Sequence, residues 1–164
     1  MGQVNMSQRA HREEIRDLIG ASRAAFLATI GEHGPESSMA PFAIYAGNPL
    51  LHLSGLARHT KNLNASPQAG LMVCTPERDG ESVLALPRLS LQGHVAVVVG
   101  EGLAQAREAY LQRIPEAEQL FAFADFRLFC LQVERIYWIA GFGSAREIPL
   151  LSWQQMWAEK TSIR

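Results

Sequence analysis

Five consecutive polar residues offer groups suited to binding a phosphate: Arg58, His59, Thr60, Lys61 and Asn62. They follow an apolar, alternating segment and a Ser-Gly break, so we expect them in a turn after a strand. Cationic side chains offset the charge of a phosphate dianion, while hydroxyl and carboxamide groups donate hydrogen bonds to its oxygens. The segment therefore predicts a phosphate-binding turn. The alternative is a solvated basic loop after an edge strand.

A second polar group lies further along the chain, where Arg88, Ser90 and Gln92 alternate with two leucines. In a strand, residues two apart project from the same face, so these three side chains share one side. The pattern predicts a polar wall that donates hydrogen bonds to a heteroaromatic ligand, with a guanidinium that would stabilise the anionic form of a reduced flavin ring. The alternative is a strand with one solvated face.

Short strands separated by tight turns must position both groups. The predicted strands are residues 24–30, 37–45, 50–54, 69–75, 88–99 and 128–140. Within them, Pro41 indicates an edge or a bulge, and Gly93 a bulge or the close approach of another backbone. Helical character is predicted for residues 8–20, 103–114 and 116–126. This order predicts a mainly β protein, a β-barrel with peripheral helices.

The composition limits the class of protein. The chain has 164 residues, 48% hydrophobic and 19% charged, with a net charge of −1, so nucleic acid and anionic membranes are not expected partners. We predict one domain over residues 1–164, with a loose leader at 1–6 and a core at about 20–148. Cys74 and Cys130 lack ligand-like spacing and are expected to be reduced, buried thiols. The start has no apolar signal region, which predicts a cytoplasmic protein.

Two further features have structural interpretations as well as functional ones. The segment Gly141-Phe142-Gly143 lacks the third glycine of a dinucleotide fingerprint and is predicted to be a tight turn. His52 alternates with leucines and is predicted to be a partly buried structural residue, whereas His94 follows the Gly93 bulge and is open to either interpretation. The histidines show no metal-ligand spacing, and no general acid or base can be assigned.

Four motifs together resemble the pyridoxamine-5′-phosphate-oxidase-like FMN-binding split barrels, nearest to the haem-utilisation (HugZ/HutZ-type) branch. Residues 53–63, LSGLARHTKNL, are similar to the signature LSxLAxHTxNL. Residues 25–43 resemble the pattern LATxxxxGxPxxSxxPYA of that branch. Residues 88–93, RLSLQG, are similar to its RLTLxG strand, and residues 137–145, YWIAGFGSA, to its YLVGGFGxA segment. The likeness covers residues 20–148 in the same order.

The resemblance implies a six-stranded antiparallel split barrel that forms a homodimer, with FMN at the subunit interface. It implies an FMN-dependent oxidoreductase acting on an unidentified small-molecule substrate. It places the 58–62 segment around the FMN phosphate and ribityl chain. It places the 38–41 strand beside the flavin ring, with Arg88 and Gln92 approaching the ring from a neighbouring strand. The residues expected to bind the cofactor are Ser38, Met39, Ala40, Pro41, Ser54, Arg58, His59, Thr60, Lys61, Asn62, Arg88 and Gln92.

Two alternatives to this function remain. The first is a haem-binding or haem-degrading utilisation protein with its site at the same interface. Haem-degrading members of the branch use a histidine near the C-terminus as the iron ligand, and no histidine follows His94 in this sequence, so a residue such as His94 would have to serve. The second is a non-enzymatic flavin-binding module. Residues 151–164, LSWQQMWAEKTSIR, contain tryptophans but no RLHDR-like segment, so vitamin B6 oxidation is not predicted.

Overall fold

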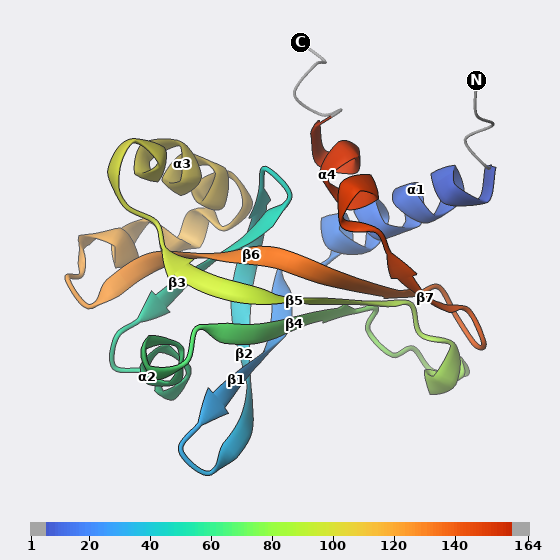
Figure 1. Ribbon diagram of the computed structural model, residues 1–164, viewed down its shortest axis with the longest axis horizontal. Helices are drawn as coiled ribbons and strands as arrows, with labels where there is room; N and C mark the ends of the chain where they lie inside the picture. The colour runs from blue at the N-terminus through green and yellow to red at the C-terminus, as the bar shows by residue number, and fades with distance from the viewer. Residues whose placement is uncertain (1–5, 159–164) are drawn as a thin grey trace.

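The computed structural model describes residues 6–158, and their side chains from residue 10 onward. Residues 1–5 of the predicted leader and residues 159–164 lie outside the described part. In chain order the elements are α1 (Met6–Ala21), β1 (Ala24–Gly31), β2 (Gly34–Tyr45), β3 (Asn48–Ser54), α2 (Arg58–Ala65), β4 (Gln68–Cys74), η1 (Val83–Ala85), β5 (Arg88–Val97), η2 (Gly100–Gly102), α3 (Leu103–Arg113), η3 (Pro115–Ala122), β6 (Phe126–Ile139), β7 (Ala145–Ile148) and α4 (Leu150–Ala158) (Figure 1).

Six strands form a closed antiparallel barrel. Their order is β3-β2-β1-β4-β5-β6, and the pairing of β3 with β6 closes it. The predicted six-stranded barrel is therefore confirmed. A seventh strand, β7, extends the sheet beyond β6 and was not predicted, because its four residues follow a turn and show no alternation of their own.

Apolar side chains fill the barrel from every strand. Leu27, Leu51, Leu71, Leu91 and Leu131 all have no exposed surface. In β1 and β5 buried and more exposed residues alternate, so one face of each strand supplies the core and the other faces outward. Each leucine buried in this way contributes about 1.5–3 kcal/mol by leaving water.

Pro41 lies where β2 changes partner. Residues 34–41 of β2 pair with β1, and pairing with β3 begins at Phe42. A proline has no N–H to donate, so this transition tolerates it better than the middle of a paired strand would. The edge position predicted for Pro41 therefore corresponds to a change of neighbour within the barrel.

Gly93 allows two backbones to approach closely, as its sequence context predicts. A Cβ atom at this position would lie 1.9 Å from the backbone oxygen of Gln132, which no side chain can tolerate. The register of β5 and β6 shifts at the same point, because Gln92 pairs with Arg135 while Gly93 pairs with Val133. The residue left over on β6 is Glu134, so the bulge itself is on β6.

Helices cover the outside of the barrel. Helices α1 and α4 lie side by side, and the Arg16 guanidinium donates to the Met156 carbonyl (Figure 1). Trp153 anchors α4 by donating from its indole nitrogen to the Gly47 carbonyl at 2.7 Å. Helices α3 and η3 confirm the helical segments predicted around Pro115, and they pack Tyr110 against β2 and β3 in a second apolar cluster.

The basic segment after β3 is a helix rather than the predicted turn. Arg58–Ala65 form α2, preceded by Ala57 in an extended conformation. Thr60 and Leu63 are buried on one side of α2, so helical spacing brings both against β1. The predicted turn was wrong. The segment is mostly polar, so its sequence did not show that Thr60 and Leu63 would be buried on one side of a helix.

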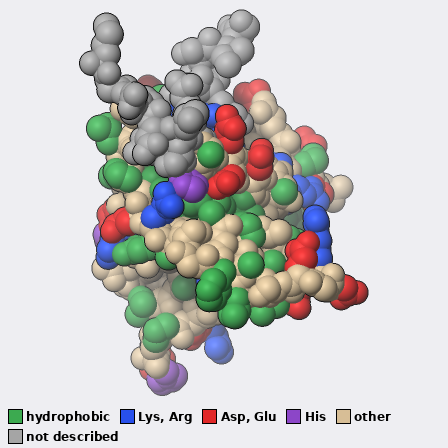
Figure 2. Space-filling view, turned by 90° about the vertical axis from the view of Figure 1, so that its right-hand side faces the viewer, with side chains coloured by type: hydrophobic (Ala, Val, Ile, Leu, Met, Phe, Trp, Pro, Cys, Tyr) green, Lys and Arg blue, Asp and Glu red, His purple; other side chains and the backbone are tan. Residues whose placement is uncertain are grey.

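Surface chemistry is mixed. Figure 2 shows acidic, basic and hydrophobic side chains interspersed on one face, in keeping with the net charge of −1. In the part of the chain that the structure describes, no helix is long and apolar enough to span a membrane. Cys74 and Cys130 are both free thiols, and each is half-buried rather than fully buried.

Candidate functional site

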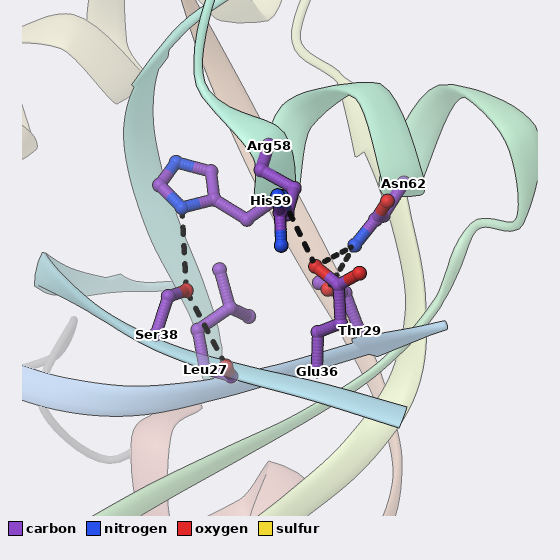
Figure 3. Close-up of polar contacts among 7 residues, drawn as sticks. All are labelled: Leu27, Thr29, Glu36, Ser38, Arg58, His59 and Asn62. Carbon is purple, nitrogen blue, oxygen red and sulfur yellow. Dashed lines mark hydrogen bonds and ion pairs between the residues drawn. The ribbon is translucent and has the colours of Figure 1, made fainter. Parts of the chain in front are cut away.

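Helix α2 brings three of the predicted site residues over the β1–β2 hairpin. Arg58, His59 and Asn62 face residues of β1 and β2 (Figure 3). Arg58 and His59 line a hollow of about 290 Å³ together with Thr29, Glu36, Ser37 and Ser38. The structure therefore gathers part of the predicted cluster in one place.

A carboxylate that was not predicted lies at the centre of this cluster. The Asn62 amide donates to Glu36 Oε2 at 3.1 Å and to Thr29 Oγ1 at 3.0 Å. Arg58 Nε lies 3.8 Å from the same Glu36 oxygen, although the Arg58 side chain is 80% exposed. Glu36 thus engages the amide and the guanidinium that were expected to bind phosphate, and its negative charge opposes a second anion there. The only sequence signal was that Glu36 alternates with Ser38 on β2.

His59 makes a separate contact. Its Nδ1 lies 3.2 Å from the hydroxyl of Ser38, which also donates to the Leu27 carbonyl at 3.4 Å. Burial lowers the pKa of His59, so its imidazole is neutral at pH 7. A neutral imidazole retains a lone pair on one nitrogen, which can accept a proton or bind a metal.

Four of the other predicted site residues lie outside this cluster. Thr60 is buried, and its hydroxyl has no hydrogen-bond partner among the described residues, whereas Lys61 is exposed. The Ser54 hydroxyl donates to Asp125 at 2.7 Å. Arg88 donates to the nearby Leu86 carbonyl.

Residues of the 38–41 strand alternate across the sheet rather than forming one surface. Ala40 is in the core, and Ser38 faces the α2 side. Met39 and Pro41 are exposed on the outer face of β2. Only the outer pair can contact a ligand on that face.

The outer face of the barrel contains a groove that the sequence did not reveal. A row of small residues crosses it, because Ser37, Ala28 and Gly70 are register neighbours on β2, β1 and β4. Gln92 and Arg135 continue the same row on β5 and β6. The row is low at its centre because neither Ala28 nor Gly70 carries a side chain beyond a methyl group.

Larger side chains flank the groove on both sides. One side is a row of four partly exposed side chains. Met39, Phe26 and Met72 are direct register neighbours, and Tyr137 follows Met72 after Ser90. Ile30 and His94 lie along the other side. Two hollows, of about 290 and about 420 Å³, share Ala28, Gly70 and Gln92 and follow these flanks.

The groove and the α2 hollow meet at Ser37, which lines both. The combined surface offers a floor of small residues, two imidazoles and, at its β6 end, the guanidinium of Arg135. Such a surface suits a flat, largely apolar ligand with anionic substituents and a group that imidazole can ligate. Alternation along each strand determines which side chains face the groove. The register between β1 and β4 then places Ala28 beside Gly70.

Comparison with known proteins identifies related chains. Residues 11–140 match the model of the family described as pyridoxamine 5′-phosphate oxidase. The chain is 34% identical over 137 residues to the non-canonical heme oxygenase HOZ, chloroplastic, of Arabidopsis thaliana, covering 81% of this chain and 41% of that protein. It is 30% identical over 142 residues to heme oxygenase HutZ of Vibrio cholerae, covering 82% and 79%. The chain thus spans less than half of the plant relative.

Solved structures agree with these relatives. A heme binding protein from Mycobacterium smegmatis superposes with a TM-score of 0.80 at 28% identity, over 88% of this chain and 60% of that one. HutZ of Vibrio cholerae, described there as a heme storage protein, gives a TM-score of 0.72 at 27% identity, over 79% and 95%.

These findings correct the predicted cofactor. FMN was expected from the family resemblance, but the relatives named above are haem proteins, so FMN as the main cofactor is wrong and the haem alternative is better supported. Glu36 supplies a physical reason, because it occupies the centre of the predicted phosphate site. The predicted family and its haem-utilisation branch are confirmed. With a matching family model over residues 11–140 and a barrel of the expected topology, the chain belongs to the pyridoxamine 5′-phosphate oxidase family.

Proposed function

We propose that this chain binds haem in the groove on the outer face of the barrel and acts in haem utilisation, with haem as the substrate of oxidative breakdown. The observation that carries the proposal is the low row of Ser37, Ala28 and Gly70 between two taller flanks. A porphyrin is a rigid plane, and a floor without large side chains lets such a plane lie against the sheet. The names of the relatives support haem as the ligand and its breakdown as the activity.

The residues present fit the chemistry of haem. Phe26 and Met72 provide apolar contacts to the porphyrin edge along one flank. Arg135 lies at the β6 end of the surface and supplies a cation for a propionate, in addition to its contact with Glu147 at 3.3 Å. His59 and His94 supply imidazoles, the commonest protein ligands of haem iron. When bound, haem would supply the iron at which oxygen reacts.

The proposal includes a homodimer in which the outer face is covered by a second copy. Phe26 and Met39 are 55% and 59% exposed, and together with Met72 and Tyr137 they form an apolar row across the sheet. An exposed apolar row of this kind, interrupted by Ser90, is typical of an interaction surface. A second copy packed along it would also close the groove and exclude water from the bound ligand.

Titration of the purified protein with hemin tests this function. We expect a Soret band shifted from that of free hemin and saturation at a fixed ratio of hemin to chain, whereas FMN in a parallel titration should leave the melting temperature unchanged. Adding ascorbate in air should then bleach the Soret band faster than it does for hemin bound to serum albumin. A spectrum identical to free hemin at every ratio would refute haem binding, and a stable band under ascorbate would refute breakdown.

A further inference from the structure

His94 occupies a distinctive position on the groove. It lies on the outer face of β5, two residues from Gln92, and lines the hollow of about 420 Å³ together with Ile30 and Gln68. Its side chain is half-buried, so it lies neither in the core nor on a surface away from the groove. It is therefore one of two imidazoles that a ligand in the groove can meet, the other being His59 at the opposite end.

The β6 bulge gives His94 a carboxylate partner. Because Gly93 accommodates the Gln132 backbone oxygen, β6 carries one extra residue at this point, and Glu134 and Arg135 are both exposed in succession. In regular pairing two successive residues would face opposite sides of the sheet. Glu134 Oε1 lies 2.5 Å from Nδ1 of His94 as a result.

This contact determines which nitrogen is available. An ionised carboxylate can only accept hydrogen bonds, so Nδ1 of His94 must carry the proton that it donates to Glu134. In the neutral imidazole, Nε2 then holds the lone pair. A histidine that ligates a metal through one nitrogen and donates the other N–H to a carboxylate is the usual arrangement in metal sites, because the carboxylate fixes the tautomer and raises the basicity of the ligand.

The charge of the partner separates His94 from His59. The Ser38 hydroxyl donates its one hydrogen to the Leu27 carbonyl, so it accepts from Nδ1 of His59 at 3.2 Å, and Nε2 of His59 also holds a lone pair. A neutral hydroxyl, however, raises the basicity of an imidazole less than a carboxylate does. Of the two histidines on the surface, His94 is the one with an anionic partner.

We propose that His94 binds the haem iron through Nε2 and that Glu134 positions it. This inference rests on the proposed haem function, and it assigns the iron ligand to strand β5, on the outer face of the barrel. Glu134 is a positioning residue: it acts through His94 and does not contact the iron.

Hemin spectra of the wild type and four single variants test the assignment. His94→Ala should lose the histidine-ligated Soret and ferric electron paramagnetic resonance signals and bind hemin about tenfold or more weakly, and added imidazole should restore the signals. Glu134→Gln keeps the shape of the side chain, so it should retain the ligand but lower the ferrous iron–histidine stretching frequency in the resonance Raman spectrum. His59→Ala removes the other imidazole of the surface and should keep the histidine-ligated signals. His33→Ala removes an exposed histidine outside the groove, so it is the control and should leave the wild-type spectrum unchanged.

Two results would overturn the assignment while the proposed function stands. An unchanged spectrum in His94→Ala would exclude His94, and a lost histidine signature in His59→Ala would assign the ligand to α2 instead. A wild type that gives no hemin spectrum at all would remove the proposed function, and this assignment with it. An unchanged iron–histidine frequency in Glu134→Gln would refute the positioning role alone.

Discussion

His52 is a buried histidine that the site does not use. Its ring stacks on Phe121 at a centroid distance of 3.8 Å and meets the edge of Tyr110 at 5.8 Å. Neither ring nitrogen has a hydrogen-bond partner among the described residues. Burial, together with the nearby charge of Arg107, lowers the pKa of His52 to about 4. The structural role predicted from its alternation with leucines is therefore what the structure shows, and it makes stability depend on pH.

The free energy of unfolding should fall as the pH drops from about 6.5 toward 4. Between these pH values the unfolded state binds a proton that the folded state excludes. The free energy of unfolding should therefore be roughly 2 kcal/mol lower at pH 5 than at pH 8. His52→Phe keeps an aromatic ring against Phe121 and should remove this part of the pH dependence. Urea denaturation at pH 5 and pH 8 measures it, with His33→Gln as a control for the loss of an exposed histidine. An equal fall in wild type and His52→Phe would exclude His52 as the cause.

Gly93 should tolerate no side chain. Gly93→Ala would place its methyl group against the Gln132 backbone oxygen, which can move only by disturbing the β5–β6 pairing, so we expect a loss of roughly 3 kcal/mol or more. Gly102→Ala is the control, because its added Cβ meets nothing within 4 Å. Thermal denaturation of both variants tests the difference, and similar melting temperatures would contradict it.

At the residue scale, sequence reasoning succeeded where the cause is local. A lone glycine in a long strand indicates a close approach, and Gly93 shows one. Glu36 was missed because its role depends on contacts with Arg58 and Asn62, which are distant in the sequence. No spacing rule connects residues of a hairpin to a helix that folds over it later in the chain.

Trp153 is a central contact between helix α4 and the barrel. Trp153 is 1% exposed, and its indole N–H donates to the Gly47 carbonyl. Gly47 has φ +81° in the β2–β3 turn, and an added Cβ would lie 3.2 Å from the Trp157 ring, so the turn and the helix fit closely.

Trp153→Phe should cost about 1–3 kcal/mol by leaving the buried Gly47 carbonyl unpaired. Trp153→Ala should cost about 3–5 kcal/mol because it also leaves a cavity. Leu151→Ala, on the exposed side of α4, is the control and should be nearly neutral. Chemical denaturation gives the three values, and a Trp153→Ala variant as stable as Leu151→Ala would show that α4 does not depend on this contact.

At the element scale, long alternating segments were predictable and short or polar ones were not. The six barrel strands follow from their own alternation and turns. Strand β7 has four residues and forms because β6 offers it an edge, and α2 is a helix because Thr60 and Leu63 pack on β1. In both cases the tertiary partner decides the local structure.

The whole molecule should be a dimer through its outer sheet face. Phe26→Glu puts a charge at the centre of the apolar row formed with Met39 and Met72, and burying that charge in an interface would be unfavourable. We therefore expect the dimer mass of the wild type to become the monomer mass in analytical ultracentrifugation. Leu56→Glu changes an exposed leucine outside this row and should remain dimeric. A Phe26→Glu variant with an unchanged mass would place the interface elsewhere.

The groove itself was beyond sequence reasoning. Ala28 and Gly70 are separated by more than forty residues, and only the β1–β4 register places them side by side as its floor. The family resemblance located the region, and Ala28 belongs to its LAT motif, but Gly70 lies outside all four motifs.

Filling the groove tests the central claim most directly. Gly70→Leu should fold, since an added Cβ has only ordinary contacts with Ala28 and the Leu91 carbonyl, yet its side chain would rise from the floor of the groove. Ala104→Leu, on the exposed surface of α3, is the matched control. In a hemin titration followed at the Soret band, we predict that Gly70→Leu binds at least about tenfold more weakly than the wild type, while Ala104→Leu binds equally well. Equal hemin affinity in a folded Gly70→Leu variant would contradict haem binding in this groove.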